Sequence, residues 1–239
     1  MILAAFGDSF LYGSDLSDCP NNYTPGGGLH PSNLTWPALL AKHFQVEYQC
    51  YAMPGSGNQR ILNDILNCVH NYGNSVIYIV NWTWMDRFDY FNKEFEYELD
   101  KWHTTRPSLD NHNIDTAYYK YLHSEELDKT MSLGHVYQAI SALQSNNCKF
   151  VMTYMDGLLL DTVYHVPDNI KFLQHQVKKY LLDFEGRTFL DWAKHNHYSI
   201  SSGLHPLDLA HKKAAEYWLP TVSQLLNTNS KEDYLHAFI

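Results

Sequence analysis

The sequence has few positive charges and gathers none of them in a run. Lys and Arg number 17 against 26 Asp and Glu, which gives a formal net charge of -9. A nucleic-acid partner held through its phosphates is therefore not expected. No apolar run approaches the roughly 18 residues that span a bilayer, and the first residues lack the basic start of a secretory signal. We expect no membrane partner and a cytoplasmic location.

Cysteine is also scarce, and the usual metal-binding patterns are missing. The four cysteines form no CxxC pair, and we interpret them as reduced, buried thiols of a protein made in the cytoplasm. The 14 histidines form no HExxH motif, so we expect no metal site and no cofactor. The glycine-rich residues 25–31 lack the GK[ST] ending of a phosphate loop. We interpret them as a rim loop of an active site.

Short apolar runs alternate with segments of helical periodicity along the 239 residues, of which 45% are hydrophobic. This length suits one domain, residues 1–239, with a sizeable core. The alternation predicts an α/β protein whose parallel sheet is covered by helices on both faces. Strands are expected at residues 2–6, 46–51, 76–80 and 149–155. Helices are expected near residues 36–44, 61–69, 125–144 and 206–226, with Pro220 kinking or shortening the last one. A further helix is expected to follow the entry signal Pro167-Asp168 and to carry residues 177–182.

Two segments depart from the alternation. Residues 86–124 mix charged and aromatic side chains with weak periodicity, and we interpret them as an insertion of loop and short helix. This insertion could serve as a lid, as a wall that stacks on sugars, or as a packing face for another chain. The tail, residues 227–239, ends in apolar residues that could dock on their own domain or on a neighbouring one. A homo-oligomer is therefore left open.

Three polar or glycine positions follow the predicted strands closely. Ser9, Gly55 and Asn81 each come at or just after the end of a strand. Ligands of parallel α/β sheets bind at the carboxyl ends of the strands, so we expect these residues to share one edge. Acyl transfer needs a nucleophile, a base within hydrogen-bond reach and donors for a developing oxyanion. Ser9 is the candidate nucleophile and His205, in a loop before a proline, is the candidate base.

Each of these residues also has an ordinary structural interpretation. Ser9 could be a turn former, Gly55 an ordinary turn glycine and His205 a loop histidine. We favour the catalytic interpretation because the residues occur together. The backbone N–H groups of Ser9 and Gly55 and the side chain of Asn81 are the candidate oxyanion donors. Asp8 is expected to hold the turn together rather than to take part in the chemistry.

Four short stretches carry a resemblance to a known family. They are FGDSF (6–10), AMPGSGN (52–58), VIYIVNWT (76–83) and SGLHPLDLAH (202–211). Together they resemble the blocks of the SGNH (GDSL-like) hydrolases, in the order that supplies Ser, Gly, Asn and His. The resemblance implies a flavodoxin-like three-layer α/β/α sandwich, here with a parallel sheet of about five strands. It also implies a serine esterase that forms an acyl-enzyme.

The third block leaves the last oxyanion donor open. The family pattern there is Gly-x-Asn, which places Thr83 in the Asn position, two residues after Asn81. Asn58 is a further candidate because it lies in the same block as Gly55.

The last block departs from the family more seriously. The family has Asp three residues before the catalytic His, and this sequence has Ser202 there. A hydroxyl cannot stabilise an imidazolium as a carboxylate does. Three arrangements remain open: a Ser–His dyad oriented by a backbone carbonyl, an acid from elsewhere such as Asp208, or weak catalysis in a protein that mainly binds.

Two functional hypotheses follow. The first is a serine hydrolase that cleaves a small-molecule or glycan ester, including acetyl or other acyl groups borne by carbohydrate. The low positive charge favours a neutral substrate over an anionic one. The second is a catalytically weakened relative that binds glycans or acts in structure or assembly. A compact, Tyr- and Asn-rich chain of this kind would suit a bacterial or phage product, in the host cytoplasm or associated with a virion.

Overall fold

The computed structural model describes residues 1–19, 30–91, 101–107 and 113–227. The rim loop expected at residues 25–31 lies largely outside these residues, and so does nearly all of the tail expected at 227–239. Neither expectation is therefore tested.

A parallel sheet of four strands forms the centre of the molecule. The strands are β1 (Ile2–Phe6), β2 (Glu47–Cys50), β3 (Val76–Trp82) and β6 (Lys149–Tyr154), in the order β2-β1-β3-β6. All three neighbouring pairs are parallel. The expected number was about five. In the described part of the chain, the position beside β6 is filled only by a parallel bridge between Met152 and Leu181.

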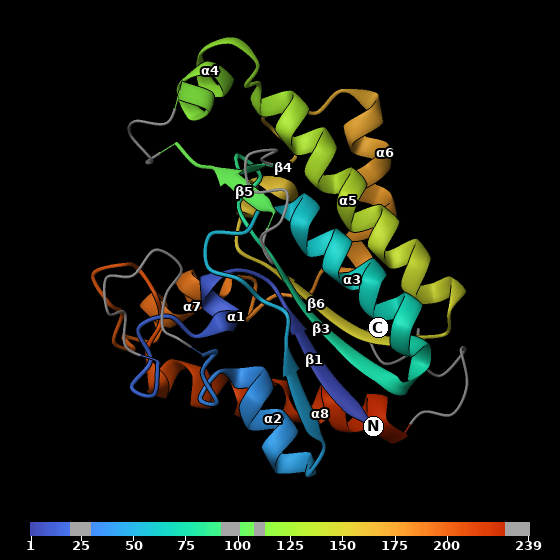
Figure 1. Ribbon diagram of the computed structural model, residues 1–239, viewed down its shortest axis with the longest axis vertical. Coiled ribbons are helices and arrows are strands. Elements are labelled where there is room, and N and C mark those ends of the chain that lie inside the picture. Colours follow the sequence, from blue (N-terminus) through green and yellow to red (C-terminus); the bar gives the residue numbers. More distant parts are fainter. Residues whose placement is uncertain (20–29, 92–100, 108–112, 228–239) are drawn as a thin grey trace.

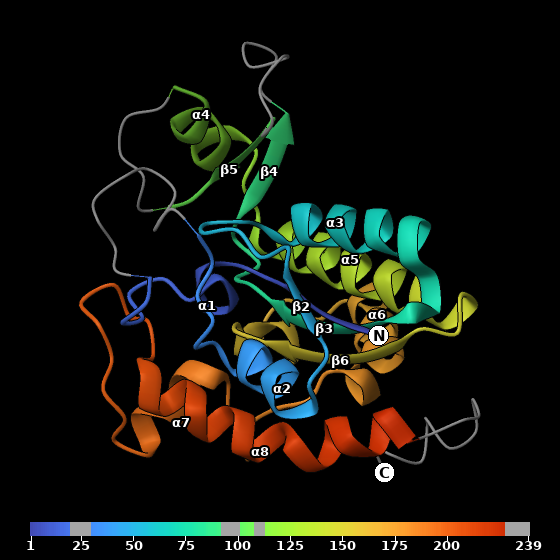
Figure 2. The same cartoon turned by 60° about the horizontal axis from the view of Figure 1, so that its bottom comes forward.

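Helices cover both faces of this sheet (Figures 1 and 2). One face carries α2 (Trp36–Phe44), α7 (Phe189–His195) and α8 (Asp208–Asn227), and the other carries α3 (Asn58–Tyr72), α5 (Glu125–Ser145) and α6 (Asp168–Val177). Alternate residues of β1 point to opposite faces, so Leu3 and Ala5 join one buried cluster while Ala4 and Phe6 join the other. The predicted three-layer α/β/α sandwich is confirmed.

Two helix predictions need correction. The helix entered at Pro167-Asp168 begins there as expected, but α6 ends at Val177 and does not carry residues 178–182, because the chain then passes through a short 3₁₀ turn to the bridge at Leu181. The last helix continues through the exposed Pro220 to Asn227, so Pro220 does not shorten it. No helix within the described ranges is both long and apolar enough to cross a bilayer.

The insertion at residues 86–124 contains more regular structure than expected. A two-stranded antiparallel sheet, β4 (Phe88–Phe91) with β5 (Trp102–Thr105), precedes the short helix α4 (Asn113–Tyr121). These elements stand beyond the end of the main sheet (Figure 2). The carboxylate of Asp89 in β4 accepts the backbone N–H groups of Gly57 and Arg60 at the start of α3, both at 2.9 Å. The insertion is thereby anchored to the sandwich.

Candidate active site

Ser9 lies at the sharp turn that follows β1. Gly7 makes the turn, and a Cβ there would lie 3.1 Å from the carbonyl oxygen of Asn81. Asp8 caps the single-turn helix α1 (Ser9–Tyr12) by accepting the N–H of Phe10 at 3.0 Å. Ser9 is the first residue of this helix and is 8% exposed. The turn therefore holds the Ser9 hydroxyl at the carboxyl edge of the sheet.

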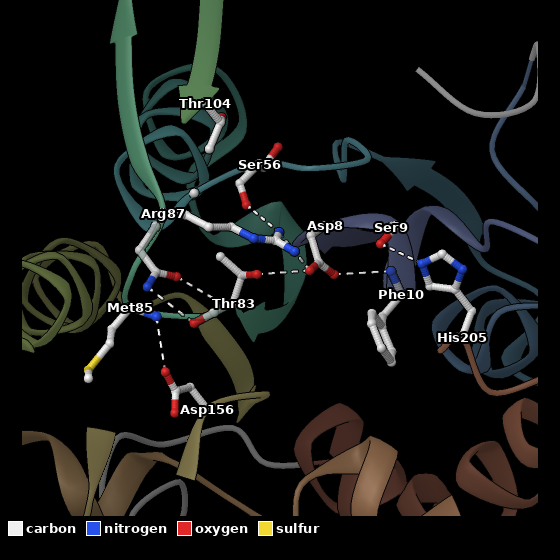
Figure 3. Close-up of polar contacts among 12 residues, drawn as sticks. Asp8, Ser9, Phe10, Ser56, Thr83, Met85, Arg87, Thr104, Asp156 and His205 are labelled. Atoms are coloured by element: carbon white, nitrogen blue, oxygen red, sulfur yellow. Dashed lines mark hydrogen bonds and ion pairs between the residues drawn. The ribbon is translucent and has the colours of Figure 1, made fainter. Parts of the chain in front are cut away.

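A hydrogen-bonded chain joins Ser9 to a histidine and a carboxylate. The Nε2 atom of His205 lies 2.9 Å from the Ser9 Oγ, and its Nδ1 atom lies 2.7 Å from Oδ2 of Asp15. A carboxylate only accepts hydrogen bonds, so Nδ1 carries the proton and Nε2 is free to accept from the serine hydroxyl. Figure 3 shows the contact between Ser9 and His205.

Asp15 was not predicted from the sequence. It follows α1 by three residues and adopts a left-handed conformation with φ of 70°. The hydroxyl of Ser201 donates to the same carboxylate oxygen at 2.6 Å. Gly203 keeps the space open, since a Cβ there would lie 3.1 Å from Asp15 Oδ2 and 3.2 Å from His205 Nδ1. The only sequence signal for Asp15 is an acid shortly after the candidate nucleophile.

The expected acids and the dyad need correction. Ser202, which occupies the family position of the acid, is exposed, and the hydroxyl that reaches the site belongs to its neighbour Ser201. Asp208 instead accepts hydrogen bonds from the backbone and the hydroxyl of Ser17. A Ser–His dyad oriented by a backbone carbonyl is also wrong, because Asp15 binds the imidazole.

Asp8 holds the turn together, as expected, and does so with a buried charge network. Its Oδ2 atom accepts the hydroxyl of Thr83 at 2.8 Å and an N–H of Arg87 at 3.0 Å. The same Arg87 nitrogen donates to the carbonyl oxygen of Ser56 at 2.8 Å. As Figure 3 shows, this network links the Ser9 turn to the segment around Ser56 and to the end of β3.

Gly55 lies in the loop between β2 and α3, next to the Ser9 turn. The N–H of Met53 donates to the carbonyl of Gly7 at 3.0 Å, which ties this loop to the turn after β1. Gly55 has φ of 83°, a conformation that glycine adopts without strain. The structure thus brings Gly55 and Ser9 to the same edge, as expected for residues at the carboxyl ends of parallel strands.

The three candidate side-chain donors have different partners. The Thr83 hydroxyl is engaged with Asp8. Asn58 holds the backbone of Thr83, accepting its N–H at 2.9 Å, and also donates to Ser132. Asn81 lies within β3 and is 1% exposed. Its oxygen accepts the hydroxyl of Thr153, and its Nδ2 has no hydrogen-bond partner among the residues that the structure describes.

Asn58 therefore has a structural role. The expectation that its side chain is an oxyanion donor is wrong, because its amide is already hydrogen-bonded. Both ends of its amide are used to fix the chain that leaves β3.

The remaining reactive groups are buried or dispersed. None of the four cysteines, all within the described residues, forms a disulfide bond, and burial raises the pKa of the Cys50 thiol to about 11. Such a thiol is protonated at neutral pH and is a poor nucleophile. Over the described part of the chain, no three His, Cys, Asp or Glu residues gather as a metal site would require.

Comparison with known proteins identifies the fold. No family model matches the sequence, and no curated protein matches it. Solved structures do match. TesA has a TM-score of 0.52 and 12% identity, with 94% of this chain and 99% of TesA covered. The acetyl xylan esterase AlAXEase has a TM-score of 0.50 and 12% identity, covering 93% and 100%. A family two carbohydrate esterase from Cellvibrio japonicus has a TM-score of 0.50 and 11% identity, covering 95% and 61%.

The chain has the fold of the SGNH hydrolases. At these identities the likeness is one of fold. Within that fold, the first, second and last sequence blocks supply Ser9, Gly55 and His205 to one edge of the sheet. The carboxylate that contacts His205 comes from the segment after α1 and not from the last of the four sequence blocks.

Proposed function

We propose that this protein is a serine esterase in which Ser9, His205 and Asp15 form the catalytic triad. One observation supports the proposal most directly: the continuous hydrogen-bonded chain from the Ser9 Oγ through both ring nitrogens of His205 to the Asp15 carboxylate. This arrangement matches the roles of nucleophile, base and orienting acid in acyl transfer.

The proposed reaction proceeds through an acyl-enzyme. His205 takes the Ser9 proton at Nε2 while the serine oxygen bonds to the ester carbonyl carbon. The imidazolium, stabilised by Asp15, then gives that proton to the leaving alcohol oxygen as the ester C–O bond breaks. A water molecule attacks the acyl-enzyme with His205 again acting as the base. The acid is released and Ser9 regains its proton.

The developing oxyanion needs donors near Ser9. The backbone N–H groups of Ser9 and Gly55 are the proposed donors, since their loops are tied together at the carbonyl of Gly7. Among the three candidate side chains, Asn81 is the one with an unpartnered amide nitrogen, and we propose it as the third donor. Thr83, whose hydroxyl is bound to Asp8, is assigned to the support of the turn.

The proposed substrates are carboxylic esters, including small acyl groups borne by carbohydrate. Two of the similar structures are carbohydrate esterases, and this is compatible with such a substrate. The alternative of a weakened, glycan-binding or structural protein was motivated mainly by the missing acid of the last block. Asp15 fills that role in the geometry, so no second function is proposed.

A fluorophosphonate probe tests the nucleophile. Such probes react with activated serines, and we expect peptide mapping to place the label on Ser9. Ser9→Ala should lose the label and at least about 10³-fold of ester hydrolysis while its circular dichroism is unchanged. The matched control is Ser202→Ala, an exposed serine of the same site region, which should keep both. A folded wild-type protein that takes no label would refute the proposal.

A further inference from the structure

Two guanidinium groups meet the segment Gly55–Ser56, in a protein whose net charge is -9: Arg106 lies against Gly55, and Arg87 donates to the carbonyl of Ser56. Arg87 belongs to the segment that follows β3, and Arg106 comes directly after β5. The charge of Arg87 is already matched, since it forms an ion pair with the buried carboxylate of Asp8. Its guanidinium also lies 4.7 Å from the ring centre of Trp84. Arg87 is thereby fixed in place.

Arg106 is placed differently. Its guanidinium lies against Gly55, where a Cβ would be 3.3 Å from both Cζ and Nη1 of Arg106. The side chain is half-buried, and its Nε is buried with no hydrogen-bond partner in the described part of the chain. Among the described residues, no carboxylate lies within ion-pair distance of it. Arg106 therefore presents an unmatched cation next to the proposed oxyanion donor.

The surroundings of Arg106 disfavour its positive charge. Burial, and next the positive charge of Arg87, lower the pKa of Arg106, whereas Asp115 and Asp8 attract it only from beyond contact distance. Arginine nevertheless remains charged at neutral pH. A partly desolvated charge without a partner is unfavourable, and an anion bound in the site would remove that penalty.

We infer that Arg106 binds an anionic group of the substrate, a carboxylate, sulfate or phosphate, beside the ester that Ser9 attacks. A guanidinium matches the planar or tetrahedral oxygens of such groups with two parallel donors. This inference rests on the proposed esterase function and specifies its substrate. It replaces the sequence-based expectation of a neutral substrate, because the charges nearest the site act on a ligand more strongly than the summed charge of the molecule does.

Matched ester pairs test the inference. On the acyl side, mono(4-nitrophenyl) succinate is compared with 4-nitrophenyl butyrate. On the alcohol side, 4-acetoxybenzoate is compared with its methyl ester. For at least one pair, wild type should have a higher kcat/KM for the anionic ester than for the neutral one. In Arg106→Gln, the kcat/KM for that anionic ester should fall by about tenfold or more. The neutral member should change less than about twofold, and Arg106→Lys should fall between. Lys171→Gln on α6 is the control for net charge, because Lys171 is exposed.

Two outcomes would overturn the inference. One is an anionic-to-neutral ratio of kcat/KM that stays the same in Arg106→Gln. The other is an equal loss of kcat/KM for the anionic and the neutral ester in Arg106→Gln. Arg106 would then stabilise the oxyanion or the fold and would not bind an anionic group of the substrate.

Binding separates this inference from the proposed function. Benzoate and sulfate are titrated calorimetrically into Ser9→Ala and into Ser9→Ala with Arg106→Gln. If wild type hydrolyses no ester yet only the single variant binds an anion, the esterase proposal fails and the anion site stands. If the two variants bind alike, the anion site is refuted whatever the hydrolysis.

Discussion

At the scale of single residues, the acid of the candidate triad is held by two hydrogen bonds of different kinds. The imidazole of His205 and the hydroxyl of Ser201 both meet Oδ2 of Asp15. The hydroxyl is a neutral donor that fixes the carboxylate, and the imidazole gains a charge during the reaction that the carboxylate stabilises. A side chain at position 203 would crowd Asp15 Oδ2 and His205 Nδ1, and would thereby disturb both contacts.

Asp15→Asn should lower kcat by about 10² to 10⁴-fold with little change in folding. The amide can present an N–H where the carboxylate accepted a hydrogen bond from Nδ1, and this favours the wrong tautomer of His205. Ester hydrolysis under saturating substrate measures the effect. Asp208→Asn and Ser202→Ala are the controls and should keep kcat within about threefold. A fully active Asp15→Asn would remove this residue from the mechanism.

At the scale of elements, the N-terminus of α3 is capped by a side chain from a distant part of the sequence. Its own N-cap residue, Gly57, has no side chain to offer. Asp89 in β4 supplies the carboxylate, and it also accepts the hydroxyl of Thr104 in β5. A Cβ on Gly57 would collide with this carboxylate. One buried acid thus couples the start of α3 to both strands of the insertion.

Asp89→Ala should lower the free energy of unfolding by about 1–3 kcal/mol, because it leaves two backbone donors and a hydroxyl without their acceptor. Urea denaturation followed by circular dichroism measures this change. Asp168→Ala is the matched control, as it removes a fully exposed acid from the first turn of α6, and it should cost less than about 0.5 kcal/mol. Equal losses in the two variants would contradict a specific cap.

At the scale of the whole molecule, one buried histidine ties stability to pH. His211 in α8 is 1% exposed, and its Nδ1 accepts the N–H of Trp36 at the start of α2. Burial lowers the pKa of His211 to about 3. Between its ordinary value of 6.5 and this value, the unfolded chain binds a proton that the folded chain does not. Acid therefore favours unfolding across that window, while above it the residue contributes nothing.

Wild type should lose up to about 1.4 kcal/mol of stability per pH unit through His211 as the pH falls below about 6. In His211→Asn, whose side-chain oxygen can still accept the Trp36 N–H, this part of the slope should vanish. Urea titrations at pH 7 and pH 5 compare the two proteins. His175→Asn, which removes an exposed imidazole, is the control. An unchanged slope in His211→Asn would show that His211 is not the source.

The sequence by itself determined the layered fold and two positions of the candidate triad, Ser9 and His205. Strand and helix periods are local, so the strands around Ile2–Phe6 and Val76–Trp82 could be predicted within two residues, and parallel connectivity then placed Ser9 and Gly55 at one edge. Only the tertiary structure decided which acid meets His205, which amide nitrogen lacks a partner among the described residues, and that Arg106 lies against Gly55. Asp15 and His205 are 190 positions apart, and their contact depends on how two irregular loops pack. No local pattern of residues encodes such packing.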